Sequence, residues 1–348
     1  MTTATMRARF LAVLGVPLAA CGPTYTATAC IPMDEGVETC PSPAEAAQTL
    51  VGPGCGEAIV SVDGPGTFVA GDDDTGWAGD RCCYPTTERE LANGCVVGRP
   101  YTTPSGALRI SPTVARGGWA RGPRPDVSAL NEEQRRVLAT AWAEDAAIEH
   151  ASVAAFSKFA LELMAAGAPA DLVDAAHAAA RDEVRHARLA YALAEAYAGG
   201  PVAPGAFPFD GAVPIVGDLP ALAAATALEG AIGETVVALL AVEALETCVD
   251  PAVRALLEVI AHDEARHAEL AWRALRWMVD AGGPAVRDAI VGVLEGVRRD
   301  GVRPPAVTFG APEVVLAAHG RLRPDAMAAM VERAMAEVVL PCMARLAA

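Results

Sequence analysis

Aromatic side chains are scarce in this chain. They make up 5% of its 348 residues, although 53% of the residues are hydrophobic. A composition with so few rings suits alanine-rich helices, and the length is enough for one large domain and one small one. We therefore predict a mostly α-helical protein with a small additional module.

Basic residues are also in short supply. The chain has 27 Lys and Arg residues against 43 Asp and Glu residues, which gives a net charge of −16. The phosphates of DNA or RNA would repel so acidic a protein. A nucleic-acid partner is therefore not expected.

The first residues lack an apolar run long enough to cross a bilayer. Arg7 and Arg9 precede the short apolar stretch Phe10–Ala20, and this order is typical of a signal peptide over residues 1–20. The stretch ends in Leu18-Ala19-Ala20-Cys21, which resembles a bacterial lipobox. We expect Cys21 to carry lipid and to anchor the protein in the cell envelope, in the periplasm or at the outer membrane. An ordinary signal peptide that is cut nearby is the alternative.

Paired C-x-x-C spacing and histidine are both missing from the cysteine-rich segment, which disfavours a zinc module. Disulfides in an oxidising compartment fit better. Without Cys21, an even six cysteines remain here: Cys30, Cys40, Cys55, Cys82, Cys83 and Cys95. Excluding a bond between the neighbours Cys82 and Cys83 leaves twelve of the fifteen pairings. Residues 21–110 are predicted to form a small disulfide module, with the pairing open.

Few strands are visible in that module. Ala58–Val62 and Thr67–Ala70 flank the turn residues Asp63–Gly66, and this pattern predicts a short hairpin. The next stretch, residues 111–130, is rich in Gly, Pro and Arg and is predicted to be a linker.

Four long helices are predicted over residues 131–283. Capping residues, prolines and glycines set their limits. The first helix is expected to begin at Asn131, which forms a capping box with Gln134, and to end at Gly167. The other three are expected to run from Pro169 to Gly199–Gly200, from Asp218 to Thr247, and from Asp250–Pro251 to Gly282–Gly283. The second and third helices are joined by about 20 residues with several prolines, which is long enough to run the length of a bundle. Residues 284–348 are predicted to add two helices, Pro284–Arg299 and Pro324–Leu346. Cys248 and Cys342 are either a disulfide or two buried thiols.

One sequence motif occurs twice in these helices. Arg181–Tyr191 and His262–Trp272 share the pattern D-E-x-R-H-A-x-L-A-aromatic. In a helix, a Glu three residues before a His lies on the same face, so each copy presents a carboxylate and an imidazole together. A single Glu-x-x-His is more often a solvated pair than a metal ligand. Two near-identical copies at matching places favour a metal site.

A single glutamate precedes each copy, on the preceding helix. Glu149 and Glu234 lie 85 residues apart (149 to 234), and the two motif histidines lie 81 residues apart (186 to 267), so the two halves look like a duplicated hairpin. Counting from each turn places Glu149 near the height of Glu183, and Glu234 near that of Glu264. Glu144 and Glu229 lie about 7.5 Å higher, which makes them poorer ligand candidates.

These residues resemble the ligand set of the ferritin-like di-iron carboxylate superfamily, which includes rubrerythrins, bacterioferritins and di-iron hydroxylases. The six matching positions are Glu149, Glu183, His186, Glu234, Glu264 and His267. The resemblance covers about residues 131–282. It implies a four-helix bundle with one long crossover and two bound metal ions. It also implies that Glu183 and Glu264 bridge the metals, whereas Glu149 and Glu234 are terminal or semi-bridging ligands.

The surrounding residues of the motif have implied roles as well. Asp182 and Asp263 resemble the carboxylates that orient a metal-bound His by accepting its second ring hydrogen. Arg185 and Arg266 either support them or form ion pairs elsewhere in the bundle. Glu229 is assigned to the surroundings of the site.

Two glycines interrupt the third helix. Gly230 and Gly233 lie within a turn of Glu234, and each costs about 1 kcal/mol relative to alanine in a helix. They indicate either close helix packing or a pocket for oxygen or substrate beside the metals. Both alternatives stay open at this point.

The resemblance implies an exported di-iron (or Mn/Fe) oxidoreductase that activates oxygen or peroxide with electrons from an unidentified donor. Two alternatives remain: an iron-binding protein or ferroxidase without organic substrate, and a structural lipoprotein with a stabilising metal site. The lipid anchor makes the membrane a partner. Assembly into a homo-oligomer is left open.

Overall fold

The computed structural model of the chain is mostly helical. The described residues are 6, 24–32, 39–50, 52–53, 57–69, 81–90, 99, 101–102, 108–209, 211, 213–300, 302 and 313–346. The chain divides into two compact units. One is Cys21–Gly94, and the other combines Met1–Ala20 with Cys95–Ala348. The predicted signal peptide, apart from Met6, and the predicted lipid-bearing Cys21 lie outside the described residues.

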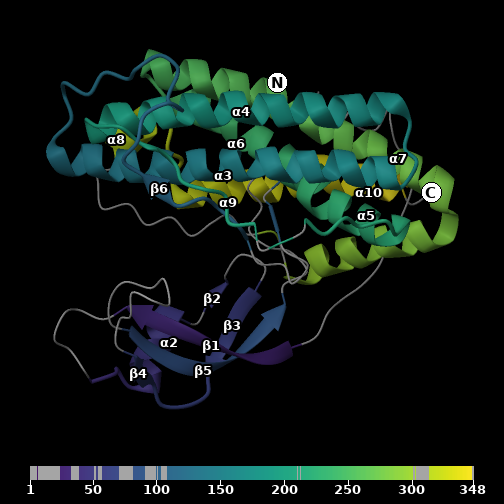
Figure 1. Ribbon diagram of the computed structural model, residues 1–348, viewed down its shortest axis with the longest axis horizontal. Helices are drawn as coiled ribbons and strands as arrows, with labels where there is room; N and C mark the ends of the chain where they lie inside the picture. Colours follow the sequence, from purple (N-terminus) through teal and green to yellow (C-terminus); the bar gives the residue numbers. More distant parts are fainter. Residues whose placement is uncertain are drawn as a thin grey trace. The chain divides into compact units, whose positions relative to one another are not determined.

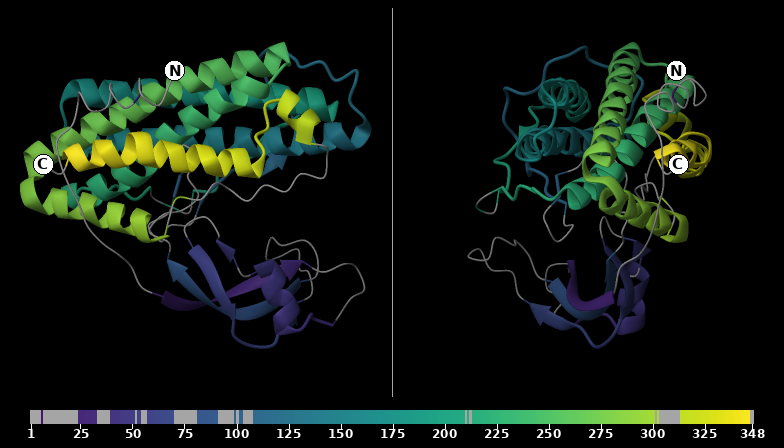
Figure 2. Two further views of the ribbon diagram at one scale, coloured as in Figure 1. Left: turned by 180° about the vertical axis from the view of Figure 1, so that it is seen from behind. Right: turned by 90° about the vertical axis from the view of Figure 1, so that its right-hand side faces the viewer.

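Four long helical segments run side by side in the larger unit (Figures 1 and 2). Their bounds are α3 Glu132–Ala165, α4 Ala170–Ala198, the run α5 Leu219–Ala225, η2 Thr226–Glu234 and α6 Thr235–Thr247, and α7 Pro251–Asp300. Helix α3 packs along α4, α7 packs along η2 and α6, and α4 contacts α7. The prediction of a mostly helical protein is confirmed.

The helix ends follow the capping chemistry of the sequence. The Asn131 side chain accepts a hydrogen bond from the backbone of Gln134, whose side chain accepts one from the backbone of Asn131, so the predicted capping box is present. Gly167 then ends this segment with a φ of 74°, a left-handed conformation that suits glycine. Asp250 caps the fourth segment by accepting from Ala252 N at 2.9 Å. These predicted limits are confirmed.

The third helical segment differs from the prediction of one regular helix from Asp218 to Thr247. Its nine residues Thr226–Glu234 form the π-helix η2. In a π-helix the backbone hydrogen bonds join residues five apart, and such turns inside α-helices are frequent at functional sites. The two glycines at positions 230 and 233 have low intrinsic preference for the α-helix, which lowers the cost of leaving it here.

The third segment also has the hydropathy of a membrane span. Among the described residues, only the run Leu219–Thr247 is long and apolar enough to pass that test, and 67% of its most apolar window is buried inside the protein. Its apolar side chains pack against α7 and belong to the hydrophobic core. Burial in this core explains why the segment is so apolar.

The fourth segment breaks where the sequence predicts. Gly283 has φ 60° and ψ −138°, and the chain continues as a second helix from Pro284. Beyond it, the short helix α8 Glu313–Ala318 precedes a helical run of α9 Pro324–Ala334, η3 Met335–Val339 and α10 Leu340–Leu346. The sequence analysis did not predict α8. Cys248 and Cys342 are both buried, and no disulfide joins them, so the alternative of two buried thiols is right.

The smaller unit is a sheet with the strand order β1-β5-β3-β2, and β4 also pairs with β5. Its elements are β1 Thr24–Pro32, α2 Pro43–Leu50, β2 Gly52–Pro53, β3 Glu57–Val62, β4 Thr67–Val69 and β5 Arg81–Glu90. The predicted hairpin is wrong, because β3 and β4 both pair with β5 and not with each other. Asp63 N donates a hydrogen bond to Pro85 O at 2.9 Å. The segment between β3 and β4 therefore follows β5 and does not fold back in a hairpin.

Two disulfides hold this sheet, Cys30–Cys83 and Cys40–Cys82. The neighbours Cys82 and Cys83 thus connect β5 to two different segments, and the prediction of disulfides in this part of the chain is confirmed for these four residues. Cys55 and Cys95 lie outside the described residues.

Residues 111–130, predicted to be a linker, lie against the helices. Thr113–Val114 (β6) pairs with Ala203–Pro204 (β7) in the connection between α4 and α5. The ring of Trp119 meets the ring of His150 edge to face, with their centroids 4.8 Å apart. These contacts tie the segment and the long connection to the bundle.

We predict that Asn131→Ala lowers the free energy of unfolding of the helical unit by about 1 kcal/mol, because the backbone N–H of Gln134 loses its capping acceptor. Asn131→Asp keeps the acceptor and is the control. Chemical denaturation followed by far-UV circular dichroism measures both, and equal losses in the two variants would contradict the capping role.

Candidate metal centre

Six acidic and imidazole side chains from four helical segments meet inside the larger unit. Helix α3 contributes Glu149, α4 contributes Glu183 and His186, η2 contributes Glu234 as its last residue, and α7 contributes Glu264 and His267. They form two groups that share Glu264, and within each group the potential ligand atoms lie within 4.8 Å of one another. Each group could hold a metal ion.

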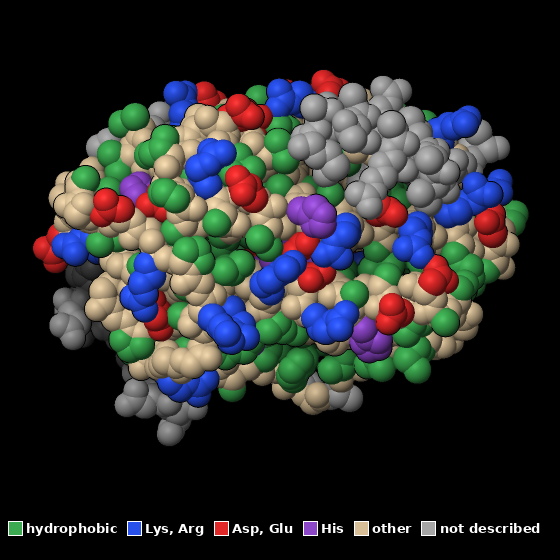
Figure 3. All heavy atoms as spheres, turned by 90° about the horizontal axis from the view of Figure 1, so that it is seen from above, with side chains coloured by type: hydrophobic (Ala, Val, Ile, Leu, Met, Phe, Trp, Pro, Cys, Tyr) green, Lys and Arg blue, Asp and Glu red, His purple; other side chains and the backbone are tan. Residues whose placement is uncertain are grey.

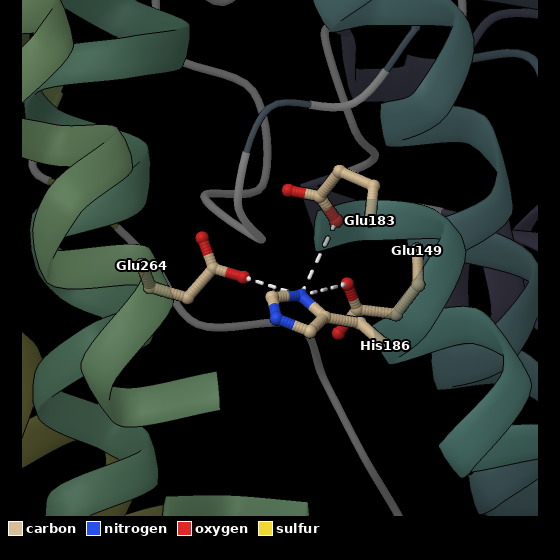
Figure 4. A group of neighbouring side chains, drawn as sticks. All are labelled: Glu149, Glu183, His186 and Glu264. Carbon is tan, nitrogen blue, oxygen red and sulfur yellow. Dashed lines mark ion pairs between the residues drawn. The ribbon is translucent and has the colours of Figure 1, made fainter. Parts of the chain in front are cut away.

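The first group surrounds one ring nitrogen of His186 (Figure 4). His186 Nδ1 lies 3.4 Å from Glu149 Oε2, 3.5 Å from Glu183 Oε2 and 3.2 Å from Glu264 Oε1. In Figure 4, Glu264 approaches from the opposite side to Glu149 and His186. Three carboxylates thus converge on one point between the helices.

The second group repeats this arrangement around His267. Its Nδ1 lies 3.1 Å from Glu183 Oε1 and 2.9 Å from Glu264 Oε2. Glu183 and Glu264 therefore each present one oxygen to each histidine. This is the placement that a carboxylate bridging two metals requires.

The other ring nitrogens face aspartates across the bundle. His186 Nε2 on α4 lies 3.0 Å from Asp263 Oδ2 on α7. His267 Nε2 on α7 lies 3.6 Å from Asp182 Oδ2 on α4. Asp263 is thus within hydrogen-bond distance of the histidine on the opposite helix and can fix its ring with Nδ1 directed at the carboxylates, whereas Asp182 faces His267 Nε2 from just beyond that distance.

The two motif arginines pair with these aspartates. Arg266 lies 2.9 Å from Asp182 and 2.6 Å from Asp263, and Arg185 pairs with both as well. Both arginines are partly exposed, and acidic and basic side chains are intermingled on the described surface in Figure 3. Of the two roles considered, they form ion pairs that also hold the aspartates next to the histidines.

Burial controls the protonation of the carboxyl groups. It raises the pKa of Glu149 and of Glu234 well above the ordinary value. Burial alone would raise the pKa of Asp263 too, but hydrogen bonds from His186 and Arg266 hold it below the usual range. Asp263 therefore stays ionised beside the histidine, whereas Glu149 and Glu234 need a further positive partner to ionise. For Glu183 and Glu264, the charge and hydrogen bonds of the two histidines outweigh burial and lower the pKa.

Several atoms of the cluster are buried without a hydrogen-bond partner among the described residues. They are Glu183 Oε2, both carboxylate oxygens of Glu234, His186 Nδ1 and His267 Nε2. Buried polar atoms of this kind are costly unless something satisfies them. The first four belong to the atoms that face inward as ligands, so this donor set fits metal cations.

The remaining predicted residues lie outside the cluster. Glu144 is exposed. Glu229 accepts a hydrogen bond from Thr102 Oγ1 at 2.7 Å and is not among the potential ligands. Gly233 is buried within η2.

The space beside Gly230 is filled. A Cβ atom at Gly230 would lie 2.7 Å from Ala271 Cβ and 3.0 Å from Arg99 Nη1. Close packing, the first of the two alternatives for this glycine, accounts for it, and the structure shows no open channel at this position. Sequence reasoning missed Arg99, because a single Arg in a Pro-rich stretch far from the helices carries no signal of its contact with η2.

Comparisons with known proteins do not extend this description: no family model matches the chain, and neither the curated proteins nor the solved structures contain a significant match.

We predict that Glu183→Ala or Glu264→Ala strongly lowers the metal bound per chain, because each removes the two oxygens that face His186 and His267. Glu144→Ala is the control and should bind as much metal as the unaltered protein. Elemental analysis of purified protein measures the content. Equal metal in all four proteins would contradict the assignment.

We predict that Gly230→Ala lowers the free energy of unfolding by about 1 to 3 kcal/mol, because the methyl group overlaps Ala271 and Arg99. Gly200→Ala is the matched control, since nothing lies within 4 Å of a Cβ there. Thermal unfolding measures both. A stabilised Gly230→Ala variant would show that the space beside η2 is open.

Proposed function

We propose that the protein is an oxidoreductase of the ferritin-like di-iron type, which holds two iron ions, or manganese and iron, and activates oxygen or peroxide. The observation that supports this most is the shared position of Glu183 and Glu264, each with one oxygen toward each histidine Nδ1. Paired metals that act together lie about 3.5 to 4 Å apart, and bridging carboxylates hold them at such distances.

The donor set favours a redox metal over a thiophilic one. Four carboxylates and two imidazoles form a hard oxygen and nitrogen site, which suits iron or manganese. When bound, such a pair would supply electrons to oxygen or peroxide. No cysteine takes part in either group.

The side chains around the metals would hold the ligands in place and exclude water from the centre. Glu183, Glu234, Glu264 and both histidines are at most 2% exposed, so the centre is shielded from solvent. Asp263 would hold the ring of His186 by accepting a hydrogen bond from its Nε2, and Asp182 lies opposite Nε2 of His267. Glu149, whose side chain is 14% exposed, is the least buried ligand candidate and lies nearest to solvent.

The cellular setting of this proposal rests on the sequence alone. The lipobox ending in Cys21 would place the enzyme in the cell envelope as a membrane-anchored lipoprotein. Its electrons would then come from a donor in that compartment. The disulfides Cys30–Cys83 and Cys40–Cys82 are compatible with an oxidising compartment.

We predict that the reduced, iron-loaded protein is oxidised rapidly by oxygen or by peroxide, with an absorbing intermediate in stopped-flow spectra. Glu264→Ala should lose this reaction, because it removes an oxygen from both groups. A second outcome, oxidation and retention of added ferrous iron without consumption of any organic compound, would identify an iron-handling protein instead. A stable zinc form that is inert to both oxidants would overturn the redox proposal and leave a structural metal site.

A further inference from the structure

A small pocket lies at the π-helix η2, which ends in the candidate ligand Glu234. It is lined by Arg99, Tyr101, Thr102, Ala155, Lys158, Glu162 and Glu229. It has room for about one water-sized group. Only the head group of a ligand can therefore enter it, and the rest must lie outside.

The unusual residue of the pocket is Arg99. It is 2% exposed, and its Nη1 has no hydrogen-bond partner among the described residues. Its guanidinium carbon lies 3.7 Å from the ring centroid of Phe159. The ring face and the nearby carboxylates of Glu229, Glu234 and Glu162 compensate part of the charge, but Nη1 still has no acceptor for its hydrogens within the described part of the chain. Arg99 is thus a buried donor that an anion would satisfy.

The other charged groups of the pocket already have partners. Lys158 pairs with Glu162 at 3.0 Å, and Glu162 also accepts from Val216 N at 3.1 Å. Glu229 accepts from Thr102 at 2.7 Å. Glu162 and Glu229 therefore already accept hydrogen bonds or ion pairs from these groups. Among the charged groups of the pocket, Arg99 Nη1 is the buried donor without a hydrogen-bond partner in the residues that the structure describes.

An apolar surface adjoins the pocket through Tyr101. The ring of Tyr101 meets Phe207 and Phe209 edge to face, with centroids 5.3 and 5.6 Å away, and the two phenylalanines lie 4.7 Å apart. Phe209 is 49% exposed. A ligand whose head group reaches Arg99 could therefore place an apolar body against exposed ring surface.

The pocket also contacts the surroundings of the metal centre. The ring centroid of Phe156 lies 5.4 Å from the Arg99 guanidinium carbon and 4.9 Å from the ring centroid of His267. Arg99 Nη1 approaches η2 at Gly230, four residues before Glu234. One aromatic ring thus touches both the free donor and a candidate metal ligand.

We propose that this pocket binds a small organic carboxylate with an apolar body, with its carboxylate on Arg99 and its body on the rings of Tyr101, Phe207 and Phe209. The planar fork of the guanidinium matches a carboxylate, and the limited room favours it over the larger phosphate group. The role of this ligand as substrate rests on the oxidoreductase function proposed above. The binding itself does not require that function.

Calorimetric titration of the full-length protein with benzoate tests the proposal. Benzamide is the neutral control of the same shape, and inorganic phosphate tests for a general anion site. We expect benzoate to bind at least about tenfold more tightly than either, because benzamide lacks the negative charge and the second acceptor oxygen, and phosphate is larger than the available room. Equal affinity for benzoate and benzamide would overturn the proposal, and tighter binding of phosphate would show an inorganic anion site instead.

Two variants locate the binding. Arg99→Met should weaken benzoate binding by about 10- to 100-fold at unchanged metal content, since it keeps an unbranched, flexible stem but removes the guanidinium donors. Phe209→Ala should weaken it by about 2- to 10-fold. Met164→Ala removes another exposed apolar side chain, which does not line the pocket, and should leave the affinity unchanged.

If a folded Arg99→Met variant binds benzoate as tightly as the unaltered protein, benzoate binds at the metals or elsewhere, and the proposal is wrong. If that variant does not fold, the exposed Phe209 decides: an effect no larger than that of Met164→Ala would refute the site. Because binding is measured without turnover, an inert metal centre would refute the oxidoreductase function and leave the carboxylate site standing.

Discussion

The structure depends on keeping four carboxylates inside a helical core. Glu183, Glu234 and Glu264 are almost fully buried, in a unit whose interior is otherwise built largely from alanine and aliphatic side chains. Charges of one sign in such surroundings repel each other and lose their hydration. Positive charge can make this arrangement stable, either on the two histidines, whose pKa values are raised, or on bound metal cations. Binding of metal and packing of the helices are therefore expected to be coupled.

Local signals in the sequence were sufficient to predict the four long helical segments of this unit and the candidate site. The capping box at Asn131 and the glycines at 167 and 283 act over a few residues, so each could be interpreted without knowing the fold. The Glu-x-x-His spacing likewise fixes a shared helix face before any packing is known. Because the motif occurs twice, its copies also indicated which helices have to meet.

Interactions between distant residues could not be predicted in the same way. Strand β5 binds β1 on one side and both β3 and β4 on the other, and nothing local distinguishes this from a hairpin. The π-helix η2 has no pattern of its own beyond two glycines. Arg99 reaches η2 from a stretch 131 residues earlier (99 to 230), so its part in the site became visible only through packing.

The contacts across the centre are reciprocal. Asp263 faces Nε2 of His186, and Asp182 faces Nε2 of His267. In the same way, His186 Nδ1 lies 3.2 Å from Glu264, and His267 Nδ1 lies 3.1 Å from Glu183. In an isologous interface, such as the one between two identical subunits related by a two-fold axis, each contact occurs twice, with the roles of the two sides interchanged. The two hairpins of this single chain meet as the halves of a homodimer do. A single ancestral hairpin could thus have built the same centre by pairing with its own copy, before duplication joined the two and allowed each half to change alone.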